Sequence, residues 1–229
     1  MQSDNPKQYL LIDEKPVLVH TLLKLQRSSL IDDILLVVPE NDIFSVRENI
    51  ERQYRLTKIR NVIAGGKERQ DSVSNGLAYA GNEYDIVVIH DGVRPFVTED
   101  MLARSIEAAL RFGAAVAGIP SKDTVKEVDC NGGILRTLDR ETIWLAQTPQ
   151  VFRRQVIQDA YARAAADDYR GTDDASLVER LGITVRMVMG SYTNIKITTP
   201  EDLVWAEAFL KDAAVHDLPP AGYKENDDS

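Results

Sequence analysis

Three short apolar runs, separated by stretches with helical spacing, constrain the fold more than any other feature of the sequence. The runs Ile34–Val38, Ile59–Ile63 and Asp85–His90 are rich in β-branched residues, a pattern typical of buried strands. Strand and helix patterns in alternation predict an α/β fold with a mostly parallel sheet and helices on both faces. Ligands in such folds bind beyond the carboxyl ends of the strands. The helical segments are 17–25, 43–54, 69–80 and 99–112.

The pattern changes after residue 112. Residues 113–120 predict another buried strand, and apolar and polar residues then alternate through Asp123–Arg140 on either side of a turn at Asp129–Gly133. This is the signature of a β-hairpin. An isolated hairpin is marginally stable in water, so we expect this arm to pack against something, such as a second copy of the chain. Further on, the sequence predicts a helix at 153–166, a strand at 184–190 and a helix that starts at Pro200 with Thr199 as its cap.

The length and charge of the chain exclude several classes of protein. Its 229 residues suit one domain, 1–211, with an arm at about 121–142 and a polar tail, 212–229, that we expect to be mobile. The net charge of −9 argues against general nucleic-acid binding, which relies on basic surfaces. The sequence shows neither a membrane span nor a signal peptide. A lone cysteine, Cys130, and the acidic composition favour a cytoplasmic location.

A pair of glycines, Gly65 and Gly66, stands between a predicted strand and a predicted helix, in the segment AGGKERQDSVSNGL. Such a junction brings a ligand close to the backbone and points free N–H groups at it. The glycines alone are explained better by a tight turn from strand to helix. The segment contains neither GxGxxG nor a Walker loop, so a dinucleotide or P-loop interpretation has no support.

Asp91 stands where the strand 85–90 ends, and Arg94 follows three residues later. A carboxylate at the end of a strand is a suitable ligand for Mg²⁺, which shares its oxygen ligands with phosphates. Arg94 is placed to pair with Asp91 or with a phosphate. A structural ion pair before Pro95 explains these residues equally well, and we expect His90 to be a packed residue with no catalytic role.

Weaker candidates come from three other places. Lys196 lies in an alternating segment that reads as a strand, where it either enters a phosphate pocket or is solvated at an edge. Thr124 and Arg140 lie near the base of the predicted arm and make a reasonable phosphate clamp. The acidic pair after Thr172 is explained most simply by Thr172 as a helix cap. Together these residues suit phosphate chemistry with a divalent cation.

Seven segments in this order, PKQYL, AGGKERQDSV, HDGVRPF, KDTVK, LDRETIWLAQTPQVF, GTDDASLVE and GSYTNIKITTPEDL, closely resemble the 2-C-methyl-D-erythritol 4-phosphate cytidylyltransferases. The resemblance runs from about residue 5 to residue 210. It implies a Rossmann-like nucleotidyltransferase fold and a homodimer locked by exchanged β-arms. It also implies Mg²⁺-assisted transfer of a cytidylyl group from CTP to 2-C-methyl-D-erythritol 4-phosphate, with release of pyrophosphate, in isoprenoid precursor synthesis.

The resemblance also implies roles for individual residues. Lys7 would stabilise phosphoryl charge in the transition state, and Lys196 would position the attacking phosphate. Gly66 and Ser72 would lie near the cytosine and ribose. The remaining implied positions are Asp91 near Mg²⁺ and substrate, Thr148 near the substrates, and Thr124 and Arg140 in the site of the partner subunit.

The family carries a buried strand and a glycine-rich loop, roughly AAGxGxRM, just before the PKQ segment. Met1 aligns with the methionine that closes this loop, so the strand and loop lie outside the sequence, and we expect a truncated start. Two alternatives stay open. The chain is a ribitol-5-phosphate cytidylyltransferase, which shares several of these motifs, or it is a non-catalytic dimeric homologue that lacks the CTP loop.

Overall fold

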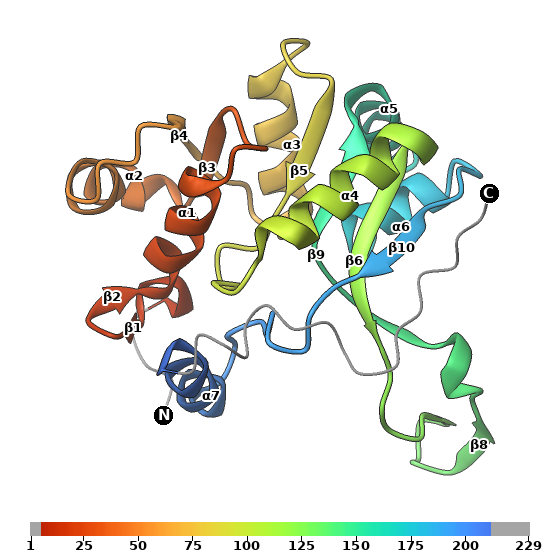
Figure 1. The fold of residues 1–229 in the computed structure, drawn as a ribbon. Helices are drawn as coiled ribbons and strands as arrows, with labels where there is room; N and C mark the ends of the chain where they lie inside the picture. The colour runs from red at the N-terminus through yellow and green to blue at the C-terminus, as the bar shows by residue number, and fades with distance from the viewer. Residues whose placement is uncertain (1–5, 212–229) are drawn as a thin grey trace.

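The structure, a computed structural model, describes residues 6–211 and shows an α/β fold (Figure 1). The elements in chain order are η1 (Lys7–Tyr9), β1 (Leu11–Ile12), β2 (Lys15–Pro16), α1 (Val17–Arg27), β3 (Ile34–Val38), η2 (Glu40–Asp42), α2 (Ile43–Val46), η3 (Arg47–Arg52), β4 (Ile59–Ala64), α3 (Arg69–Ala80), β5 (Ile86–Ile89), α4 (Glu99–Phe112), β6 (Ala114–Pro120), β7 (Lys126–Val128), β8 (Ile134–Thr137), η4 (Arg140–Thr142), β9 (Trp144–Arg153), α5 (Arg154–Ala166), α6 (Asp174–Glu179), β10 (Arg186–Met189) and α7 (Pro200–Lys211). The expected tail, 212–229, lies outside the described residues.

The central sheet has four strands in the order β10-β6-β9-β5. Strand β10 is parallel to β6, whereas β9 is antiparallel to both β6 and β5. Strands β5, β6 and β10 therefore point the same way, and their carboxyl ends share one edge of the sheet. The α/β class is confirmed, but the sheet is mixed because β9 runs antiparallel to both of its neighbours. The sequence did not predict β9 to be a strand. Pro149 within β9 is a residue that argues against a central strand.

Helices cover both faces of this sheet, as Figure 1 shows. On one face, Ala115 of β6 and Val151 of β9 are fully buried in a cluster with Ala109 of α4. On the other face, Val116 and Phe152 pack into a cluster with α5 and α6. Neighbouring residues of each strand thus enter different cores, which is why both strands are apolar on both faces.

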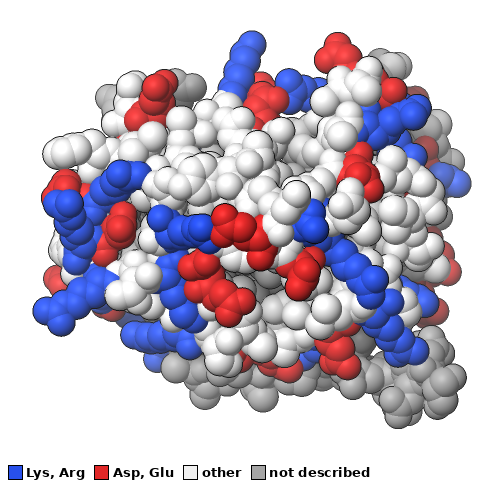
Figure 2. All heavy atoms as spheres, turned by 90° about the horizontal axis from the view of Figure 1, so that it is seen from above, with Lys and Arg blue, Asp and Glu red and all other residues white. Residues whose placement is uncertain are grey.

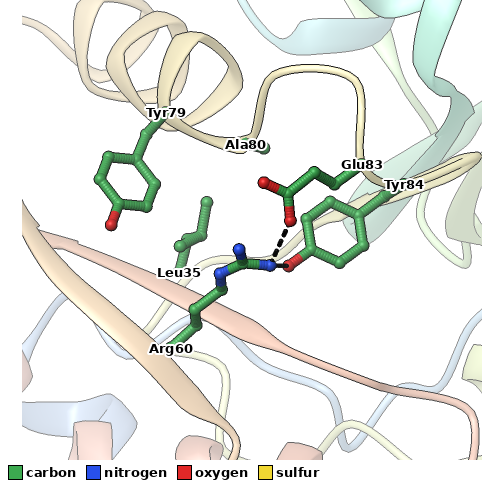
Figure 3. Close-up of a pocket in the computed structure, with 6 residues that line it drawn as sticks. All are labelled: Leu35, Arg60, Tyr79, Ala80, Glu83 and Tyr84. Atoms are coloured by element: carbon green, nitrogen blue, oxygen red, sulfur yellow. Dashed lines mark hydrogen bonds and ion pairs between the residues drawn. The ribbon is translucent and has the colours of Figure 1, made fainter.

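A second sheet consists of the parallel pair β3 and β4. Within residues 6–211, β3 pairs only with β4 and β5 pairs only with β9, so each strand leaves one edge without a ladder. Side chains join the two sheets. Arg60 of β4 donates to the Tyr84 hydroxyl at 2.5 Å and pairs with Glu83 at 2.6 Å, and Tyr84 donates to Asp33 at 2.7 Å. Figure 3 shows Arg60 directed at Glu83 and Tyr84.

Several predicted boundaries are confirmed and others are wrong. Helices α3 and α4 have the predicted bounds. Helix α7 begins at Pro200, and Asp202 accepts hydrogen bonds from the N–H groups of Thr198 and Thr199. The helix predicted at 43–54 is instead a short α-helix, α2, followed by the π-helix η3. The cap of α6 is Asp173, which accepts a hydrogen bond from the Ser176 N–H at 2.9 Å, and not Thr172.

The predicted hairpin forms from β7 and β8 and projects from the body of the molecule (Figure 1). Every residue of its two strands is exposed. Its large apolar side chains are bare, with Val128 52%, Ile134 65% and Leu135 62% exposed. Within residues 6–211 nothing covers these apolar side chains, and an exposed apolar surface of this kind favours a protein partner.

Charged side chains are mixed in sign on the face shown in Figure 2, which views the molecule from above. Lysine and arginine lie among aspartate and glutamate there, without a separate basic region. This face therefore lacks the basic surface on which general nucleic-acid binding depends. In residues 6–211 no helix has the length and apolar character needed to span a membrane.

The burial of β9 leads to a first prediction. Phe152 is fully buried between β5 and β6 and packs against α5 and α6, whereas Phe44 of α2 is 77% exposed. We expect Phe152→Ala to lower the free energy of unfolding by about 3–5 kcal/mol, because the core closes poorly over the cavity. The matched Phe44→Ala should change it by less than about 0.5 kcal/mol. Urea unfolding of both variants measures the difference, and equal effects would contradict the packing described for β9.

Candidate active site

One carboxylate, that of Asp91, meets three cationic side chains just beyond the end of β5. Its Oδ1 lies 3.2 Å from Nε of Arg69, and its Oδ2 lies 3.1 Å from Nζ of Lys196 and 3.5 Å from Nε of Arg94. The carboxylate is only 12% exposed. Burial alone would raise the pKa of Asp91, but Lys196, Arg69 and Arg94 together hold this pKa below its usual value. Asp91 is thus a fixed anion within an excess of positive charge.

Three segments that are distant in sequence supply these cations. Arg69 is the first residue of α3, whose N-terminus is closed by a capping box in which Glu68 and Asp71 accept from each other's backbone N–H groups. Lys196 lies between β10 and α7. Its segment is anchored by the Ile197 N–H, which donates to the Val93 carbonyl at 2.9 Å. The fold therefore brings the start of α3, the end of β5 and the segment after β10 together at Asp91.

Lys196 joins the Asp91 group, but the segment around it does not have the structure that the sequence predicted. The segment around it forms no strand, so the predicted alternating strand is wrong. The Asn194 N–H instead bonds back to the Ser191 carbonyl at 3.1 Å, in a turn. The alternation itself is present, because Ile197 is fully buried while the Lys196 side chain is 43% exposed. An alternation of buried and exposed side chains was interpreted as a strand, although within residues 6–211 no strand pairs with this segment.

Thr148 fixes the main chain of Asp91 from the opposite side. Its hydroxyl accepts a hydrogen bond from the Asp91 N–H at 3.0 Å and lies 3.1 Å from Nδ1 of His90. Nε2 of His90 lies 3.0 Å from the carbonyl oxygen of Arg94, which can only accept. We therefore assign the proton to Nε2, so that Nδ1 accepts from the Thr148 hydroxyl. As predicted, His90 is a packed residue, and Thr148 is brought directly to Asp91.

Arg94 presents donors that the protein does not fully use. One of its terminal nitrogens donates to the Asn194 carbonyl at 2.8 Å. Its Nε is buried and makes no hydrogen bond within residues 6–211, since the 3.5 Å approach to Asp91 is an ion pair longer than a hydrogen bond. A buried guanidinium with a spare donor is suited to an anionic ligand such as a phosphate.

The glycine junction forms a tight loop that is held by Ser72. The Ser72 hydroxyl accepts from the Gly66 N–H and donates to the Glu68 carbonyl, both at 3.1 Å. A Cβ at position 66 would lie 2.2 Å from Cβ of Asp71, so the capping box of α3 leaves room for glycine alone. Gly66 and Ser72 are therefore adjacent, and their contacts with each other explain the tight turn; their place near the cytosine and ribose stays a prediction.

The other predicted residues lie apart from the Asp91 group. Lys7 is exposed on η1, at the end of a segment anchored by Tyr9, whose hydroxyl donates to Asp42 at 2.8 Å. Thr124 and Arg140 are exposed at the base of the arm, where Arg140 approaches the Lys122 carbonyl at 3.4 Å. No contact within residues 6–211 joins these three residues to Asp91.

Two residues of the site were missed by the sequence interpretation. Arg69 lies within the quoted AGGKERQDSV segment but was given no role, and Asp174 was treated as a helix-terminus acid. The structure places Nη2 of Arg69 2.7 Å from Oδ2 of Asp174, whose side chain is 1% exposed. The two residues are 105 positions apart, and no local pattern in the sequence links them.

Comparisons with known proteins identify the family of this chain. The sequence profile of the family described as "IspD: 2-C-methyl-D-erythritol 4-phosphate cytidylyltransferase" matches residues 1–212. This chain belongs to that family. A cytidylyltransferase of this name from Syntrophus aciditrophicus is 67% identical over 211 residues, which are 92% of this chain and 90% of the relative. The one from Geotalea uraniireducens is 53% identical over 92% of this chain and 91% of its own.

Solved structures of the family have the same fold. The 4-diphosphocytidyl-2C-methyl-D-erythritol synthase from Anaerococcus prevotii aligns with a TM-score of 0.83 and 34% identity, over 90% of both chains. The 2-C-methyl-D-erythritol 4-phosphate cytidylyltransferase from Thermus thermophilus aligns with a TM-score of 0.75 and 33% identity, over 90% of this chain and 94% of the other. The predicted nucleotidyltransferase fold is confirmed by these likenesses.

The hydrogen bonds of His90 lead to a prediction about how the stability of the protein depends on pH. Burial lowers the pKa of His90 from 6.5 to about 4. Protonation therefore favours the unfolded chain, so the stability from neutral His90 is complete above pH 6.5 and is lost as pH falls from 6.5 toward 4. We expect the thermal midpoint of the wild type to fall more steeply in this window than that of His90→Gln, which cannot titrate.

Scanning calorimetry between pH 4 and pH 7.5 measures this difference. The lowered pKa of Asp91 also affects stability at the acid end of this window, but both proteins carry Asp91, so its contribution cancels in the difference. Parallel pH profiles for the wild type and His90→Gln would contradict the network.

Proposed function

We propose that this chain transfers the cytidylyl group of CTP to 2-C-methyl-D-erythritol 4-phosphate. An oxygen of the sugar phosphate attacks the α-phosphorus of CTP and forms a new P–O bond. The bond from the α-phosphorus to the bridging oxygen breaks, and pyrophosphate leaves with that electron pair. The products are 4-diphosphocytidyl-2-C-methyl-D-erythritol and pyrophosphate. Family membership supports the reaction, and the charge arrangement at Asp91 supports the roles assigned to the residues.

The observation that carries this proposal is the gathering of three cations on one carboxylate. Two anionic substrates repel each other, so the protein must lower the cost of bringing them together. Lys196 and Arg94 are the cations that can turn from Asp91 to the sugar phosphate, since Lys196 is partly exposed and Arg94 has a spare buried donor. Asp91 holds both side chains in place before the substrate arrives.

The CTP end of the site is assigned to the loop at Gly66 and Ser72 and to Lys7. The Gly66 loop is compact and exposed at the start of α3, where the partial positive charge of the helix terminus favours an anionic or polar ligand. Lys7 is exposed on η1, so its ammonium group is available for phosphoryl charge.

The arm is assigned to a second subunit. Thr124 and Arg140 make no contact with Asp91 in their own chain, and the apolar side chains of the arm are exposed. A homodimer with exchanged arms would cover those side chains and bring Thr124 and Arg140 to the sugar phosphate of the partner. The support for this arrangement is the exposure of the arm.

A resident Mg²⁺ ion does not fit the described residues. Both oxygens of Asp91 are engaged by cations, and no group of three or more metal-binding side chains occurs within residues 6–211. A single carboxylate that is already ion-paired is a poor site for an ion that demands six oxygen ligands. Asp91 as a Mg²⁺ ligand stays a prediction, and no step of the proposed reaction is assigned to the ion.

The reaction is tested by pyrophosphate release from CTP with either of two sugar phosphates. We expect turnover with 2-C-methyl-D-erythritol 4-phosphate and not with ribitol 5-phosphate. Turnover of ribitol 5-phosphate alone would show a different cytidylyltransferase. Calorimetry with CTP and Mg²⁺ tests the alternative of a non-catalytic homologue. Tight CTP binding by the 229-residue chain would exclude that alternative, and absence of CTP binding would support it.

The assignment of the arm is tested by mixing two variants. Lys196→Ala and Arg140→Ala should each lower kcat/KM by about a hundredfold or more, because each removes a cation from the phosphates. If the arm acts on the partner site, mixed dimers carry one site with both defects and one intact site. Random mixing should then restore about a quarter of the wild-type activity.

The matched control is a mixture of Lys196→Ala with Arg94→Ala, since both residues lie in the same subunit's Asp91 group. Each mixed dimer then carries one defect in each of its two sites, and no activity should return. Lack of recovery in the first mixture, with both variants dimeric by sedimentation, would show that Arg140 does not act across the dimer.

A further inference from the structure

Asp174 is a deeply buried acid at the start of α6, and the reaction proposed above gives it no role. Its side chain is 1% exposed and has two partners. Oδ2 accepts from Nη2 of Arg69 at 2.7 Å, and Oδ1 accepts from the Tyr161 hydroxyl at 2.6 Å. Burial and the neighbouring Asp174 both raise the pKa of Tyr161, so this hydroxyl stays a donor.

Arg69 is the link between this buried acid and the substrate site. Its Nη2 points inward to Asp174, and its Nε points outward to Asp91 at 3.2 Å. Burial opposes the charge on Arg69, but Asp174 and Asp91 raise its pKa, so the guanidinium remains cationic. An uninterrupted chain of bonds thus runs from Tyr161 of α5, through Asp174 and Arg69, to Asp91.

The three cations around Asp91 are not held equally. Lys196 has the carboxylate of Asp91 as its one ion-pair partner within residues 6–211, and its side chain is 43% exposed. Arg94 is anchored through the Asn194 carbonyl. Arg69 alone among the three is fixed by a second carboxylate, which is buried. When a phosphate draws Lys196 and Arg94 away, Arg69 is the cation that stays beside Asp91.

We propose that Asp174 is a positioning residue for cytidylyl transfer, which acts by holding Arg69 against Asp91. Asp91 would otherwise lose its counterions as Lys196 and Arg94 turn to the sugar phosphate, and a bare carboxylate would then repel the incoming dianion. A permanent partner removes that repulsion and lowers the cost of releasing the other two cations. This inference rests on the proposed function, since it assigns a sugar phosphate to Lys196 and Arg94.

A merely structural role for Asp174 predicts something different. The residue begins α6, where an acid is favoured, and it also satisfies Tyr161 in the core. In that case its loss would lower the stability of the protein and raise KM for CTP and for the sugar phosphate alike. The positioning role predicts that the loss of Asp174 raises KM mainly for the sugar phosphate, and that this effect requires Arg69.

The test is a double-mutant cycle on kcat/KM with Asp174→Asn, Arg69→Met and the double variant. We expect each single change to raise KM for the sugar phosphate by about tenfold or more, with KM for CTP nearly unchanged. The double variant should be no worse than Arg69→Met, because Asp174 acts only through Arg69. Losses that multiply in the double variant, or equal losses for CTP and sugar phosphate, would overturn the proposal.

Two control variants separate positioning from general damage. Tyr161→Phe removes one bond to Asp174 but leaves its bond to Arg69, so we expect lower stability with near wild-type KM values. Asp167→Asn removes an acid that is likewise paired with arginine, between Arg163 and Arg180 at the end of α5, and should leave both KM values unchanged. A Tyr161→Phe variant as impaired as Asp174→Asn would show that the whole cluster, and not the placement of Arg69, matters.

The cycle remains readable if one variant or the reaction itself fails. If Asp174→Asn does not fold, the comparison of Arg69→Met with the double variant still applies, because the double variant removes both charges together. Wild-type turnover in the same assay tests the proposed function separately. If the wild type is inactive, the cycle is measured on affinity for inorganic phosphate by calorimetry, and additive losses there overturn the inference.

Discussion

The carboxylate of Asp91 is the interaction on which the rest of the site depends. It is the one group that α3, the end of β5 and the segment after β10 all contact, through Arg69, Arg94 and Lys196. Without this carboxylate the three cations would repel one another in a low-dielectric setting, although backbone contacts such as the Ile197 N–H to the Val93 carbonyl also join the segments. A single buried negative charge therefore organises a positively charged pocket, and the helix cap at Glu68 and the Thr148 hydroxyl keep its surroundings rigid.

Much of the fold could be read from the sequence because its signals are local. The periodicity of 69–80 and 99–112 and the Thr199 cap of α7 are set by residues within a few positions of each other, and the structure confirms them. Strand β9 could not be read in this way. Its polar residues Gln147, Thr148 and Gln150 are buried because distant partners satisfy them, such as Asp173, which accepts from Gln150 at 2.7 Å.

The same distinction applies to the site. Asp91, Arg94, Thr148 and Lys196 were identified from motifs, and the structure brings all four together. Arg69 and Asp174 were missed because their pairing spans 105 positions and each also fits a local explanation at a helix start. Thr124 and Arg140 illustrate the opposite limit, since their predicted role requires a second chain. Residues that act through another residue, or in another subunit, leave no periodic mark on the sequence.

Strand β9 connects the arm to the Asp91 group. It leaves the arm at Trp144 and reaches Thr148 four residues later, roughly 13 Å at the rise of a strand. Along that path it is laddered to β6, with Trp144 opposite Pro120 and Ala146 opposite Gly118. The arm therefore cannot slide along the sheet without breaking backbone hydrogen bonds. The register against β6 shifts between Ala146 and Gln150, and Thr148 lies in that irregular stretch. The irregularity that turns the Thr148 hydroxyl toward Asp91 therefore also separates the register of the arm from that of the central sheet.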